Sequence, residues 1–197
     1  MRLSKVVLPL MCMCTLTSCG ISASKEEFVK KGNEVAGKYN YDKVSVDYSA
    51  KTDTEKGAGS CSFTYKNGKY VADEPSEITG AVSLYFSFTP NSIDVEKSFK
   101  YYEDAWLDYY KDDGKVEWSV KYFVSPFKVV GKFKSTATTK ETVKEKKMDF
   151  TYKFDEYFNI TSYVGEITTS ENTEKDGYKV VSETNSYTKI KFKYSNL

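Results

Sequence analysis

Few residues of this chain have the type and spacing that catalysis requires. Asp104 and Asp108 lie four positions apart in a helical pattern, one turn from each other. A paired-carboxylate hydrolase needs two acids that converge on a cleft with separated pKa values. This pattern is instead typical of a solvated helix face. Cys61, Phe63 and Tyr65 occupy every second position and so share one face of a predicted strand. This placement favours a buried thiol that packs like a small apolar side chain over a reactive nucleophile.

The missing residue types exclude more than the present ones suggest. The chain has no His, so it can form neither a Ser-His-Asp triad nor an imidazole metal site. Its one arginine is Arg2, so a mature protein without it has no guanidinium fork for phosphate or carboxylate. A calcium loop with Gly114 at its sixth position would put Tyr109 first and Lys111 third, where the loop needs ligands. We therefore expect no enzymatic activity, no metal and no cofactor.

The strongest motif precedes a cysteine near the start of the chain. Arg2 and Lys5 are followed by an apolar stretch, residues 6–16, that is too short to cross a bilayer, which takes roughly 20 residues. Two small residues, which fit the subsites of a signal peptidase, come next, and they are followed by a cysteine whose thiol can accept a diacylglyceryl group. This pattern predicts a bacterial lipoprotein signal peptide, residues 1–18, cleaved before the lipidated residue Cys19. The signal peptidase would recognise Leu16, Thr17 and Ser18.

Cys12 and Cys14 do not fit the lipoprotein motif, because bulky methionines precede them. The alternative to lipidation at Cys19 is an ordinary signal peptide or an N-terminal membrane anchor that is not cleaved. Lipidation would place the protein on the extracytoplasmic face of the cell membrane. Residues 19–24 would form a very short tether to a single domain, residues 25–197. The Lys-, Asn- and Tyr-rich composition favours an AT-rich, Gram-positive host.

Overall charge is almost balanced in the mature chain. Without Arg2 and Lys5, the 29 basic residues fall to 27, one fewer than the 28 acidic residues. This balance argues against nucleic acid as a partner and against a polybasic membrane-surface binder.

Hydrophobic periodicity predicts mostly strands. Ser24 and Glu27 form a capping-box pattern before a helix over residues 25–39. Asn67-Gly68 predicts a tight hairpin in which Tyr65 faces Tyr70. Apolar residues alternate with polar ones over the strands, and a second helix fits residues 93–111. The predicted strands are 44–50, 61–65, 82–88, 116–122, 127–133, 148–154, 160–168, 178–182 and 190–194.

The predicted fold class is α+β. We expect an antiparallel, strongly curved, half-barrel-like sheet of about 8–9 strands covered by two helices. Three polar segments, 51–58, 138–147 and 169–177, are expected to be loops.

Aromatic residues account for 16% of the chain, and most fall on the apolar side of the predicted elements. A packed core explains most of them. A concave sheet under a helix would alternatively hold an apolar ligand such as an acyl chain. The residues that would line such a site are Phe86, Phe99, Trp106, Trp118, Phe127 and Phe150.

The order of elements, with the segment Tyr122-Phe123-Val124-Ser125-Pro126-Phe127-Lys128-Val129, resembles LolA-type lipoprotein carriers and related mycobacterial lipid-binding lipoproteins. The resemblance is topological, and the arginine that such carriers often use is absent. It implies a half-open β-barrel around helices that holds lipid or acyl chains. No binding residue follows from it.

Two functions remain open at this point. One is a membrane-anchored, non-catalytic binding module for a hydrophobic ligand or an envelope lipid. The other is a surface interaction or adhesion lipoprotein with a packed core, whose polar loops contact an envelope or host protein.

Overall fold

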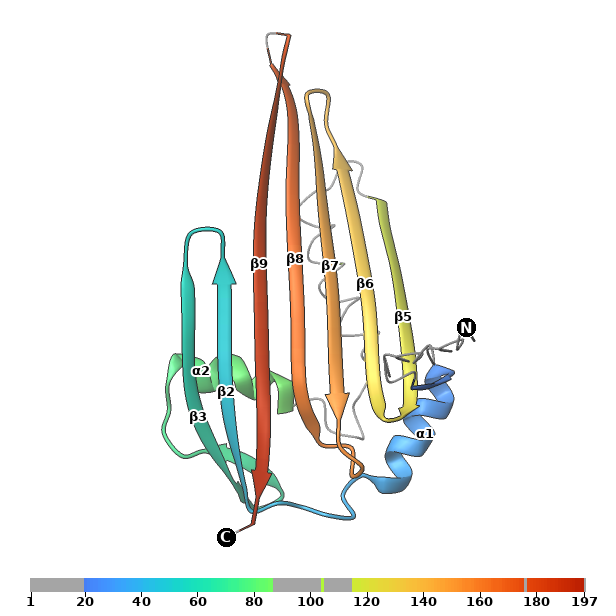
Figure 1. Cartoon of the computed structure of the whole chain (residues 1–197), viewed down its shortest axis with the longest axis vertical. Helices are drawn as coiled ribbons and strands as arrows, with labels where there is room; N and C mark the ends of the chain where they lie inside the picture. Colours follow the sequence, from blue (N-terminus) through green and yellow to red (C-terminus); the bar gives the residue numbers. More distant parts are fainter. Residues whose placement is uncertain (1–19, 87–103, 105–114, 176, 197) are drawn as a thin grey trace, which may run out of the picture.

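The structure is a computed structural model of the chain, and it describes residues 20–86, 104, 115–175 and 177–196. The predicted signal peptide, Cys19, Phe99 and Trp106 lie outside these residues. So does the predicted helix over residues 93–111 except for Asp104, which is helical and exposed. Nine strands and two helices are described (Figure 1). They are β1 (Ile21–Ala23), α1 (Lys25–Val35), β2 (Lys43–Thr52), β3 (Lys56–Lys66), β4 (Lys69–Ala72), α2 (Glu77–Phe86), β5 (Lys115–Ser125), β6 (Phe127–Thr138), β7 (Thr142–Phe154), β8 (Ile160–Lys175) and β9 (Tyr178–Ser195).

All nine strands form one open antiparallel sheet in the order β1-β5-β6-β7-β8-β9-β2-β3-β4. This confirms an α+β fold with about the expected number of strands. The expected cover of two helices is overstated, because α1 and α2 are short and lie against the lower part of the sheet (Figure 1). The strands β6 to β9 extend well beyond them.

The sheet has two chemically different faces. The apolar face carries the side chains of the core, which align across the strands through the register. Its fully buried members include Val44, Val46, Val129 and Ile190, and both helices pack on this side. The polar face carries the alternate residues, which are mostly Lys, Glu, Asp, Ser and Thr. Alternation of this kind is expected when one face of a sheet is solvated.

Helix α1 begins where the sequence predicts and ends earlier. The side chain of Ser24 accepts a hydrogen bond from the backbone N–H of Glu27 at 3.1 Å, which confirms the N-cap. The helix ends at Val35 rather than near residue 39, because Gly37 adopts a left-handed conformation with φ of 71°. Phe28 is fully buried and anchors the helix to the sheet.

Residues 82–86 of the strand predicted over residues 82–88 belong instead to helix α2, and residues 87 and 88 lie outside the described residues. Ser76 and Thr79 cap its first turn reciprocally: Thr79 N–H donates to Ser76 Oγ at 3.1 Å, and Ser76 N–H donates to Thr79 Oγ1 at 2.7 Å. Apolar residues occur here at both odd and even positions, so alternation alone could not separate a strand from a buried helix. The helix lies against β3, where the side chain of Ile78 sits over Gly59.

The three polar segments expected to be loops are largely strand. Residues 51–58 and 138–147 are hairpins with short turns, and residues 169–175 continue β8. The strands predicted over 178–182 and 190–194 are a single strand, β9. The Asn67-Gly68 hairpin is confirmed, with φ of 52° and 83° at the two positions and Tyr65 opposite Tyr70.

Candidate interaction surfaces

The predicted apolar lining is only partly brought together. Trp118, Phe127 and Phe150 share the apolar face, at different levels of the sheet. Phe150 is 3% exposed, and its ring covers Gly131 on the neighbouring strand. Phe127 packs edge-on against Phe158, with 5.0 Å between ring centroids. These two rings therefore belong to the packed core.

Trp118 differs from them, since it is 38% exposed. It borders an open depression of about 310 Å³ whose lining also includes Phe133 and Met148, together with neighbouring charged residues of β5, β6 and β7. Phe86 ends α2, and its side chain lies outside the described part of the structure, as do Phe99 and Trp106.

Polar groups on the apolar face do not assemble a reactive site. Ser135 and Lys146 are cross-strand partners, and burial lowers the pKa of Lys146. The Ser135 hydroxyl is buried and has no hydrogen-bond partner, so it is not bonded to the lysine. Burial raises the pKa of the half-buried Cys61 thiol. Among the described residues, no three Cys, Asp or Glu side chains come together as metal ligands.

The polar face carries a cluster of lysines that the sequence analysis missed. The lysine cluster occupies two neighbouring rows of the sheet. Lys128 and Lys153 lie directly opposite each other on β6 and β7. Like charges in this position destabilise a sheet, unless an anion lies nearby. The members of the cluster are Lys121, Lys128, Lys153, Lys189 and Lys191.

These lysines have no acidic partners in the described part of the chain. Among the described residues, the only carboxylate in the two rows is Asp47, which lies opposite Lys191 in the register but forms its ion pair with Lys193 at 3.1 Å. The ammonium group of Lys128 instead sits over the ring of Phe123, 4.3 Å from its centroid. Within the described residues the cluster is thus a patch of positive charge with a single carboxylate, that of Asp47, at its edge, on a chain whose overall charge is nearly zero.

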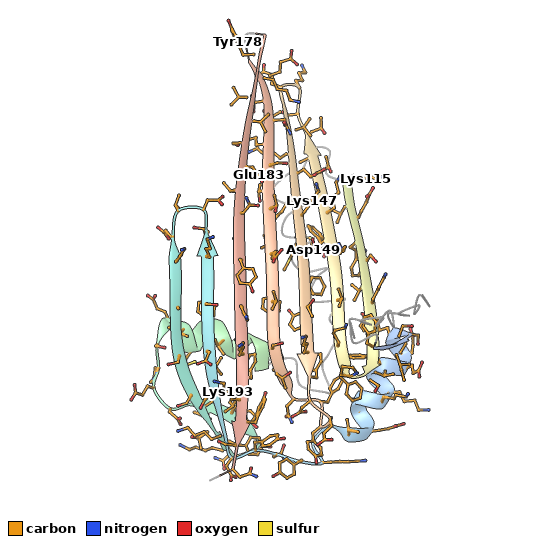
Figure 2. The ribbon with its side chains drawn as sticks, in the orientation of Figure 1. Lys115, Lys147, Asp149, Tyr178, Glu183 and Lys193 are labelled. Carbon is orange, nitrogen blue, oxygen red and sulfur yellow. The ribbon has the colours of Figure 1, made fainter. Side chains whose placement is uncertain are left out.

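Lysines further along the same face are neutralised. Lys134 and Lys147 both bind Glu145, at 2.5 and 2.7 Å, and Lys132 binds Asp149 at 3.2 Å. Figure 2 shows Lys147 and Asp149 well above Lys193, which lies near the lower end of β9. The lysine cluster therefore lies at the end of the sheet where β1 and α1 are also found.

The described chain begins beside this cluster. A Cβ on Gly20 would lie 3.1 Å from Cδ1 of Phe123, so Gly20 rests against the side chain that Lys128 covers. Gly20 directly follows the predicted lipidation site, Cys19, in the sequence, and Gly20 itself contacts the phenyl ring beneath Lys128.

A sequence signal for the cluster did exist. Lys189, Lys191 and Lys193 alternate along one strand, and so share a face. Their proximity to Lys128 and Lys153 depends on pairing between strands that are far apart in the sequence. Net charge carries no information about that pairing.

No helix of the described residues is both long and apolar enough to span a bilayer. No protein family, curated protein or solved structure matches this chain.

Proposed function

We propose that this protein is a non-catalytic lipoprotein, anchored through Cys19 to the extracytoplasmic face of the cell membrane, that binds anionic envelope lipids with its lysine cluster. The observation that carries the proposal is the set of five lysines on one face that form no ion pair with a described acidic residue, one of which, Lys128, covers the Phe123 ring that Gly20 contacts. A lysine near an anionic membrane surface contributes about 1 kcal/mol. Five would add roughly 5 kcal/mol to the anchoring by acyl chains and would fix which face of the sheet meets the headgroups.

Lysine footprinting of the full lipidated chain tests this contact. The chain would be inserted into vesicles of phosphatidylcholine, or of phosphatidylcholine and phosphatidylglycerol in equal parts, and acetylated with a reagent that does not cross membranes. We expect the lysine cluster to react several-fold more slowly on the anionic vesicles. High salt should remove the protection, because it screens the headgroup charge.

Matched double variants separate the cluster from total charge. K153Q/K191Q should abolish the protection of the remaining cluster lysines. K56Q/K140Q removes the same charge at turns on the far ends of the strands and should leave the protection unchanged.

Three results would contradict the proposal. A chain that enters neither kind of vesicle lacks the anchor. Equal acetylation on both kinds of vesicle shows an anchored protein without lipid contact at the cluster. Stronger protection by a soluble anionic polymer than by vesicles would assign the cluster to a different partner.

A second candidate is an apolar-ligand carrier, favoured by the exposed face of Trp118 and the open depression beside it. It requires the sheet to curve as a half-barrel around the ligand. Native mass spectrometry of gently purified protein tests this function, since a carrier should arrive with bound lipid. Protein that is always empty would reject it.

A further inference from the structure

The upper part of β9 is an open sheet edge. Strand β2 ends at Thr52, which faces Ser186, so β8 is the only described strand that pairs with β9 above this point. Figure 1 shows the β8–β9 hairpin projecting beyond the β2–β3 hairpin. No described strand pairs with the other edge of residues 178–185.

This edge is exposed on both faces of the sheet. All side chains of residues 178–185 are exposed. Tyr178, Val180 and Val181 are 75%, 57% and 60% exposed, which is unusual for large apolar side chains. Figure 2 shows Tyr178 at the tip of the hairpin and Glu183 lower on the same strand. The segment contains no proline and its pairing with β8 has no register shift, so it lacks two features that protect natural sheet edges.

The direction of the free backbone groups follows from one contact. Asn185 N–H donates to the carboxylate of Asp53 at 2.6 Å, so it points away from β8. Backbone groups alternate in direction along an antiparallel strand. The N–H and C=O groups of Lys179, Val181 and Glu183 therefore point outward at the open edge.

We propose that this edge pairs with the same edge of a second copy of the chain, antiparallel and centred on Val181. The centre places Val181 opposite Val181 and Lys179 opposite Glu183, twice by symmetry. All three residues have outward-facing backbone groups, which allows six hydrogen bonds between the copies. Opposite charges across antiparallel strands stabilise the pair, and the segment is thus complementary to itself in both charge and hydrogen bonding.

The complementarity favours a second copy over another extended polypeptide. Any extended strand could bond to the same backbone groups. Only pairing with a second copy makes use of Lys179 and Glu183, which have opposite charges and lie at equal distances on either side of Val181. The inference does not depend on membrane binding, since the lysine cluster takes no part in the contact.

Zero-length crosslinking of the full chain tests the pairing. Unlabelled and nitrogen-15-labelled protein would be mixed in detergent, without vesicles, and treated with a carbodiimide that joins lysine to carboxylate. We expect mixed-label peptides that join Lys179 to Glu183. Within one strand these residues are about 13 Å apart, too far for a zero-length link. Lys179 also faces Glu174 within its own hairpin, so that crosslink serves as the internal control.

Charge variants test the register. K179E and E183K should each weaken the dimer by about tenfold, measured by sedimentation, because each places like charges opposite one another. The double variant K179E/E183K should restore it. E166K makes the same substitution on an exposed position of β8 and should leave dimerisation unchanged.

The proposal is overturned if the chain stays monomeric at high concentration, or if mixed-label crosslinks join other residues. It is also overturned if the double variant dimerises no better than the single ones. Recovery of the edge with a different polypeptide bound, and no mixed-label product, would assign the site to that partner instead. Membrane protection of the lysine cluster could persist in every one of these cases.

Discussion

Replacing Gly32 with alanine should destabilise the protein, although the same change stabilises most helices. Gly32 is buried in α1, where the ring of Phe158 crosses it. A Cβ at this position would lie 2.6, 2.8 and 2.9 Å from three carbons of that ring. These distances are far shorter than ordinary carbon–carbon contacts, so either the ring or the helix must move.

Neighbouring rings oppose the movement. Phe158 is stacked on Phe154 with 4.8 Å between centroids, and it lies edge-on to Phe127 at 5.0 Å. Phe28 is 5.2 Å away from it on the same helix as Gly32. Overpacking in such a core costs about 1–3 kcal/mol. The gain in helix propensity from glycine to alanine is about 1 kcal/mol. We expect a net loss of up to about 2 kcal/mol in the free energy of unfolding.

Urea unfolding followed by circular dichroism measures this difference. N33A, at an exposed position of the same helix, is the control and should be neutral or slightly stabilising. In a Phe158→Ala background the clash is removed, so Gly32→Ala should then stabilise the protein by about 1 kcal/mol. A G32A protein more stable than the parent chain would refute the close contact between α1 and Phe158.

Three further predictions concern single sites. Gly131→Ala should lower the free energy of unfolding by about 2–3 kcal/mol in urea titrations, because its Cβ would enter the ring of Phe150. Hydrogen bonds from Ser62 and Thr64 lower the pKa of Asp73 from 3.8 to about 2, so its stabilising contribution should be present above pH 3.8 and lost as pH falls through about 2. An NMR titration should show that low midpoint, and Ser62→Ala should raise it. Because burial raises the pKa of Cys61, iodoacetamide should modify this thiol slowly at pH 8 until urea unfolds the protein.

The sequence predicted those elements that obey a single local rule. Ser24 caps α1 because its side chain reaches an N–H three residues ahead, which depends on nothing distant. Asn67 and Gly68 adopt positive φ values because few other residues do so easily. Alternation located most strands, since their apolar side chains face a core on one side only.

The misplaced elements lack such a rule. Residues 169–175 of β8 contain no apolar side chain, so hydrophobic periodicity could not detect the strand and the segment was expected to be a polar loop. Residues 183–189 of β9 are almost entirely polar, and for the same reason they were assigned to no strand. Helix α2 is apolar at consecutive positions, and its cap at Ser76 decides between helix and strand. The lysine cluster depends on the register of β5 to β9. The nearly balanced net charge argued against a polybasic surface, because net charge averages over both faces and both ends of the sheet.

The symmetry of the proposed dimer bears on the proposed membrane contact. Two strands that pair antiparallel about Val181 are related by a two-fold axis perpendicular to the sheet. Such an axis leaves the polar faces of both copies pointing in the same direction. Both lysine clusters, and both Gly20 residues beside Phe123, would then meet one flat surface. A bilayer is such a surface, and ten lysines on one dimer would bind it more tightly than five on a monomer. Variants that break the dimer, such as E183K, should therefore weaken the protection of the lysine cluster on anionic vesicles without abolishing it.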